Sequence, residues 1–92
     1  MRASSGQRQT FRGITRTIFN RLRKRASQLG IPIRGHVGNA FKDGVDLHWN
    51  YDPASEQLDV ECRRVPFWIN SNNVSQLLRN EIEAVIEKNR AA

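Results

Sequence analysis

The residues whose types and spacing most clearly suggest chemistry are the cations in the first part of the chain. Ten Lys and Arg residues and no Asp or Glu precede Asp43, whereas residues 43–92 hold five bases and nine acids. The formal charge is therefore +10 before Asp43 and −4 from it onward, which sums to the net charge of +6. A concentration of positive charge of this kind attracts polyanions.

Seven of these cations are candidates for binding a polyanion. All but one are Arg, whose planar guanidinium can bind two phosphate oxygens at once. The candidates are Arg8, Arg12, Arg16, Arg21, Arg23, Lys24 and Arg25. No helix-turn-helix spacing, zinc-finger pattern or aromatic RNA-binding signature accompanies them, so nucleic acid and an acidic protein both stay open as partners. The alternative is a solvated helix face that the acidic second half of the chain partly neutralises.

His36 and His48 are the next candidates for chemistry. On neighbouring antiparallel strands, with both rings on the polar face of one sheet, they could approach each other beside Asp46, Asp59 or Glu61. Histidine and carboxylate side chains ligate metals and transfer protons. Polar sheet faces also carry such residues without any ligand, and no HExxH or Cys-His spacing is present. We therefore expect no metal, no cofactor and no catalytic residue.

Phe67 and Trp68 are candidates for a protein interface, because aromatic side chains are enriched among the residues that dominate binding energy. The alternative is that they plug one end of the core, and the large area that an aromatic buries favours the plug in so small a protein. Cys62 is the single cysteine. It excludes an intramolecular disulfide, and we expect it to be a small buried side chain in a protein of a reducing, cytoplasmic setting.

The helix that must position the cations is predicted over residues 11–29, where apolar residues recur at three- and four-residue steps. This apolar stripe consists of Phe11, Ile14, Ile18, Phe19, Leu22, Ala26 and Leu29. On the opposite side of the predicted helix lie Arg12, Arg16, Arg23 and Lys24, while Arg21 and Arg25 flank the stripe. Gly30 and Pro32 end the helix. Residues 1–10 lack apolar periodicity and are predicted to form a flexible basic arm.

Three strands are predicted after the helix. The first is interrupted by glycines and has its apolar residues at odd positions, namely Ile31, Ile33, Val37 and Phe41. Asp43-Gly44 predicts a hairpin turn, and strict alternation then predicts strands over residues 45–52 and 57–63. Strands joined by short turns pair antiparallel. The polar face of this sheet is predicted to carry Arg34, His36, Asp46, His48, Asp59, Glu61 and Arg63.

A second helix is predicted from residue 74 onward, after a cap at Ser71, Asn72 or Asn73. Its stripe consists of Val74, Leu77, Leu78, Ile82, Val85 and Ile86. The predicted fold is α+β, a two-layer α/β sandwich in the order helix, three-stranded antiparallel meander, helix (α-β-β-β-α). Both helices are expected on one sheet face, because a sheet with one apolar face needs a single covering layer. Residues 11–90 then form a single domain.

These features predict a small, non-enzymatic binding or assembly module that contacts nucleic acid or an acidic protein through its N-terminal basic helix. The alternative is a structural or accessory subunit that acts through Phe67-Trp68 and the open sheet face. Unpaired sheet edges also make a homodimer an expectation to test. We infer no small-molecule substrate and expect no transmembrane segment. The composition of residues 1–30 also resembles that of an organellar transit peptide, which is the alternative to a cytoplasmic location.

Overall fold

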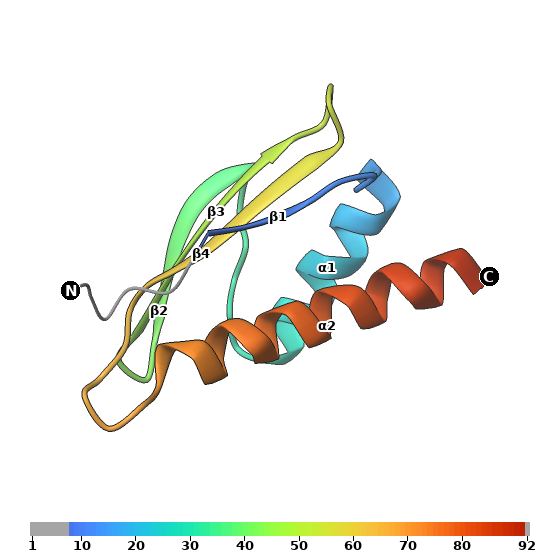
Figure 1. Cartoon of the computed structure of the whole chain (residues 1–92). Helices are drawn as coiled ribbons and strands as arrows, with labels where there is room; N and C mark the ends of the chain where they lie inside the picture. Colours follow the sequence, from blue (N-terminus) through green and yellow to red (C-terminus); the bar gives the residue numbers. More distant parts are fainter. Residues whose placement is uncertain (1–7, 92) are drawn as a thin grey trace.

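The computed structural model describes residues 8–91 and contains two helices and four strands (Figure 1). In chain order these elements are β1 (Arg8–Phe11), α1 (Arg16–Gln28), β2 (Val37–Lys42), β3 (Val45–Asp52), β4 (Gln57–Arg64) and α2 (Ser71–Ala91). The α+β class predicted from the sequence is therefore confirmed. Neither helix in this part of the chain is both long enough and apolar enough to cross a membrane.

The four strands form one antiparallel sheet in the order β1-β4-β3-β2. The prediction of three strands misses β1, which takes residues 8–10 from the predicted flexible arm and Phe11 from the predicted helix. Residues 1–7 of that arm lie outside the described residues. In β1, Arg8 pairs with Glu61 and Phe11 pairs with Leu58. Thr10 also donates its hydroxyl to Asp59 at 2.8 Å. The N-terminal segment thereby covers the edge of β4, so the strand order differs from that of the predicted meander.

α1 begins at Arg16, five residues after the predicted start of the helix. Gly13 has a φ of +73°, a left-handed conformation that a helix cannot include, and Thr15 caps the helix by accepting a hydrogen bond from the backbone N–H of Ile18. Phe11 and Ile14 are buried as the stripe requires, but they lie in β1 and in the following loop. The apolar stripe therefore predicted the burial of these two residues correctly, but their assignment to the helix was wrong.

The turn at Asp43-Gly44 fixes which side chains of β2 face the core. Both residues have positive φ, 53° and 83°, as a two-residue hairpin turn requires. This turn pairs Lys42 with Val45 and Phe41 with Asp46, so Phe41 shares the polar face of the sheet. Val37 and Phe41 are accordingly 59% and 71% exposed. The odd positions of this strand therefore face away from the core.

The core lies between the sheet and the helices. α1 covers the sheet face that carries Trp49 and Tyr51, whereas α2 packs both on α1 and on β4 (Figure 1). The second helix therefore rests partly on the first, a placement that differs in detail from two helices lying side by side on one sheet. The buried hydrophobic side chains are Phe11, Ile14, Ile18, Phe19, Leu22, Leu47, Trp49, Tyr51, Leu58, Val60, Cys62 and Ile82.

Candidate functional site

The seven candidate cations are all exposed, but they lie in three different elements. Arg8 belongs to β1, Arg12 to the loop before α1, and the other five to α1. Arg8 lines a small hollow on the open sheet face that also contains Asp59 and Glu61. Arg12 donates to Gln57 at 3.0 Å. The structure therefore does not place all seven on one helix face, and the prediction that Arg12 is helical is wrong.

Among the cations of α1, Arg25 is the one with an ion pair within residues 8–91. Its Nε lies 2.8 Å from Oε1 of Glu81, and its Nη2 lies 3.3 Å from Oε2. This hydrogen bonding, aided by charge attraction, lowers the pKa of Glu81 against the opposing effect of desolvation, and it raises the pKa of Arg25. The ion pair of Arg25 with Glu81 thus links α1 to α2.

The remaining cations of α1 have no carboxylate partner anywhere in the described part of the chain. They are Arg16, Arg21, Arg23 and Lys24. The acidic second half of the protein does not neutralise them, because its ion pairs with Arg63, Arg79 and Arg90 are made elsewhere. The outer face of α1 is therefore a surface of uncompensated positive charge.

Two of these cations line a surface groove of about 380 Å³ between α1 and the loop that leads to β2. Arg23 and Lys24 lie on its helical side, and Arg34 lies on the loop side, together with the polar side chains of Asn20 and Ser27. No acidic residue lines the groove. We call this groove, together with Arg23, Lys24 and Arg34, the cationic groove.

Two local features build the cationic groove. The backbone N–H of Ile31 donates to the carbonyl of Ala26 at 2.8 Å, and Gly30 has a φ of +83°, so the chain reverses at the end of α1. Arg23 then donates its Nε to the carbonyl of Ile33 at 3.1 Å. Arg34 was predicted on the polar sheet face, but this reversal places it beside α1. The Gly30 and Pro32 signals predicted the end of the helix without showing where the chain would go next.

The sequence left open whether His36 and His48 approach each other, and the structure places them on different sides of the sheet. His36 lies against the aromatic rings of Phe19 and Tyr51, with ring centroids 5.7 and 5.4 Å away, on the core side of the sheet. Nδ1 of His48 instead lies 3.2 Å from Oδ1 of Asn39 on the polar face. Within residues 8–91 no cluster of three or more His, Cys, Asp or Glu side chains could hold a metal ion.

Phe67 and Trp68 occupy the tip of a turn and do not plug the core. The backbone N–H of Ile69 donates to the carbonyl of Pro66 at 3.0 Å, which makes Phe67 and Trp68 the two central residues of this turn. Their side chains are 95% and 71% exposed, and the two rings meet edge to face at 5.1 Å. The preference for a core plug is therefore wrong, because both side chains face solvent and lie outside the core.

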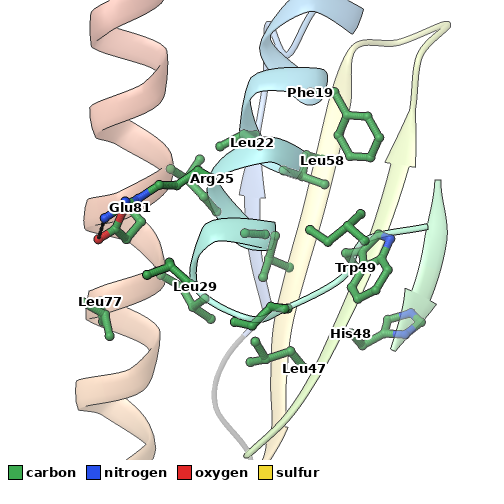
Figure 2. Close-up of a pocket in the computed structure, with 16 residues that line it drawn as sticks. Phe19, Leu22, Arg25, Leu29, Leu47, His48, Trp49, Leu58, Leu77 and Glu81 are labelled. Atoms are coloured by element: carbon green, nitrogen blue, oxygen red, sulfur yellow. Dashed lines mark hydrogen bonds and ion pairs between the residues drawn. The ribbon is translucent and has the colours of Figure 1, made fainter. Parts of the chain in front are cut away.

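An apolar cavity of about 270 Å³ lies between α1, α2 and the sheet (Figure 2). Leu22 and Leu58 line its interior with Trp49, and the Arg25–Glu81 ion pair lies at its edge (Figure 2). Sequence reasoning missed this cavity, because helical and strand periodicities show which residues face inward but not whether they fill the space.

Comparison with known protein families, curated proteins and solved structures found no match for the chain.

Proposed function

We propose that the protein is a non-enzymatic nucleic-acid-binding module that grips phosphates through the cationic groove and the adjoining outer face of α1. The observation that carries this proposal is the absence, within residues 8–91, of a carboxylate paired with Arg23, Lys24 or Arg34, which line one groove. A surface that served solubility alone would gain nothing from collecting three unpaired cations in a concavity, where their fields reinforce one another.

The type of the cations favours phosphate over carboxylate as the partner group. Arg23 and Arg34 present planar guanidinium forks that match two phosphate oxygens, and Lys24 adds a point charge. Because the Nε of Arg23 is already hydrogen-bonded to the Ile33 carbonyl, this guanidinium is held toward the groove by the protein itself. Asn20 and Ser27 supply neutral polar groups beside the charges. Such contacts position a nucleic-acid backbone without reading its sequence.

Binding of fluorescently labelled duplex DNA and single-stranded RNA, measured by anisotropy over a range of salt concentrations, tests the proposal. We expect affinity to fall steeply between about 50 and 200 mM salt, because cations bound to phosphates displace counterions. The base sequence of the DNA or RNA should have little effect on the affinity. Polyglutamate serves as the competing polyanion: if it binds while both nucleic acids fail to bind at low salt, the partner is an acidic protein and the proposal is contradicted.

A second candidate function, a protein–protein contact through Phe67 and Trp68, is favoured by their exposure. Two adjacent aromatic rings at the tip of a turn present apolar area that a partner could desolvate. Trp49 is buried and Trp68 is exposed, so the two tryptophans can be told apart. In a Trp49→Phe variant the emission should arise from Trp68 and shift to shorter wavelength when a partner or a second copy covers it. A cytoplasmic location remains part of the proposal of a nucleic-acid-binding module.

A further inference from the structure

We propose that the apolar cavity between α1, α2 and the sheet binds an uncharged, predominantly apolar small molecule. This inference is independent of the cationic groove, which lies on the outer side of α1. The cavity is bounded by α1, α2 and the sheet. Leu22 of α1 and Trp49 of β3 contribute to its wall (Figure 2), and so does Ile82 of α2.

The size of the cavity sets it apart from an ordinary packing defect. Protein interiors contain few voids larger than a water molecule, whereas this cavity would hold about nine waters at about 30 Å³ each. An apolar cavity of about 150 Å³ already accepts a molecule as large as benzene. The present cavity therefore has room for a fused aromatic ring system or for an alkyl chain of comparable volume.

The lining decides the chemistry of the ligand. Apart from Arg25, Glu81 and His48, every residue that lines the cavity has a hydrocarbon or aromatic side chain. Arg25 binds both carboxylate oxygens of Glu81 through Nε and Nη2, and the His48 ring points away from the cavity toward Asn39 on the polar face of the sheet (Figure 2). A charged or strongly polar ligand would lose its hydration without gaining a partner, which costs free energy. An apolar ligand would instead restore the dispersion contacts that the empty space lacks.

The cavity also has an entrance. Leu29 at the end of α1 and Leu77 of α2 line it, yet they are 41% and 59% exposed, so the wall reaches solvent where these residues lie. Figure 2 shows them on facing sides of the gap between the helices, next to the Arg25–Glu81 ion pair. This ion pair holds the two helices together at the rim of the cavity. An apolar molecule can therefore enter between Leu29 and Leu77 without passing the cationic groove.

The inference is tested by titrating the protein with N-phenyl-1-naphthylamine, an uncharged apolar probe whose fluorescence rises in an apolar environment. We expect saturable binding of one probe per chain and a melting temperature that rises with probe concentration. Ala26 is half-buried and lines the cavity, whereas Ala84 is exposed on α2 and does not. Ala26→Leu fills the cavity with a helix-compatible side chain and should weaken binding at least tenfold. Ala84→Leu, the matched control, should bind as the wild type does.

A second variant keeps the test decisive if Ala26→Leu fails to fold. Leu77→Lys changes an exposed side chain at the entrance, which the fold tolerates, and should also weaken binding of the probe. The double variant Phe67→Ala/Trp68→Ala should retain it. Absence of saturable binding by the wild type would overturn the inference. So would binding that survives Ala26→Leu and Leu77→Lys but disappears without Phe67 and Trp68, because the probe would then sit on the surface.

Discussion

Arg25 of α1 and Glu81 of α2 form a two-point ion pair, with 2.8 Å between Nε and Oε1 and 3.3 Å between Nη2 and Oε2. It is the ion pair that joins the two helices within residues 8–91. Both residues also line the apolar cavity, whereas neither lines the cationic groove.

The ion pair predicts how stability depends on pH. Hydrogen bonding to Arg25 lowers the pKa of Glu81 below its ordinary value of 4.5, so the native state favours the ionised carboxylate. The resulting stabilisation is complete above pH 4.5 and is lost as the pH falls through the lower pKa of the folded protein. Glu81→Gln should lower the melting temperature slightly at neutral pH, because exposed ion pairs contribute little. The melting temperatures of the variant and the wild type should converge in acid.

Thermal unfolding of both proteins from neutral to acidic pH measures this effect. The control is Glu87→Gln, which removes an ion pair with Arg90 that is 72% exposed on both sides and does not join two elements. A difference between Glu81→Gln and the wild type that stays constant at all pH values would contradict the assignment.

Tyr51 predicts a second dependence of stability on pH, in the alkaline range. Its hydroxyl donates to the carbonyl of Ile14 at 2.6 Å inside the core. Burial raises the pKa of this phenol above 10.0, with Glu56 adding to the shift and Arg16 opposing it. The stabilisation that results is complete below pH 10 and is lost as the pH rises through the pKa of the folded protein. Because Tyr51 is the single tyrosine, the absorbance of tyrosinate should report its titration directly and give a midpoint above 10.

Tyr51→Phe tests the same contact at neutral pH. The variant leaves the Ile14 carbonyl without its donor, so we expect the free energy of unfolding to fall by about 1–3 kcal/mol in a denaturant titration. An unchanged value would show that the hydroxyl contributes nothing to the attachment of this loop.

The prediction of the fold from sequence succeeded where periodicity was strong and failed where a local signal was overlooked. The alternation in β3 and the Asp43-Gly44 turn located the central hairpin. Gly13 and Thr15 were readable signals for a late start of α1, but the stripe that begins at Phe11 hid them. Phe11 is apolar at a spacing that suits either a helix or the end of a strand, and only its pairing with Leu58 decides between them.

The candidate site was predictable in type but not in place. The excess of Arg was plain, yet pairing between helices decides which cations are uncompensated, and Arg25 was not separable from Arg23 by sequence alone. Arg34 joins the cationic groove because the chain reverses at Gly30, a tertiary outcome that no local pattern encodes. The cavity depends on how completely side chains fill space, which periodicity does not report.

Gly38 of β2 lies so close to Trp49 that we expect no larger residue to fit at this position without loss of stability. A Cβ at this position would come within 2.9 Å of Cζ2 of Trp49, a buried ring that could not yield easily. Gly38→Ala should therefore lower the free energy of unfolding by about 1–3 kcal/mol, as overpacking does. Gly35→Ala is the matched control, since its Cβ would meet nothing closer than the Val37 carbonyl oxygen at 3.9 Å. Equal effects of the two substitutions in chemical unfolding would argue against this contact.

The exposure of Phe67 and Trp68 predicts that both are dispensable for folding. Phe67→Ala and Trp68→Ala should each leave the free energy of unfolding within about 0.5 kcal/mol of the wild type, as is usual for surface substitutions. If these rings plugged the core, each truncation would cost about 3–5 kcal/mol. Denaturant titration followed by circular dichroism distinguishes the two results without relying on tryptophan emission.

The most direct test of the proposed function is the salt dependence of duplex DNA binding in two triple variants with the same net charge. One variant removes the cationic groove through Arg23→Gln, Lys24→Gln and Arg34→Gln. The other removes three exposed cations elsewhere through Arg64→Gln, Lys88→Gln and Arg90→Gln. Both reduce the net charge from +6 to +3, since three charges are subtracted in each case.

The slope of log K against log salt concentration should flatten by about 2.7 in the groove variant, because each lost phosphate contact removes about 0.9 from it. It should stay close to the wild-type slope in the other variant. Equal slopes in the two variants would contradict the account, since total charge and not the cationic groove would then determine binding.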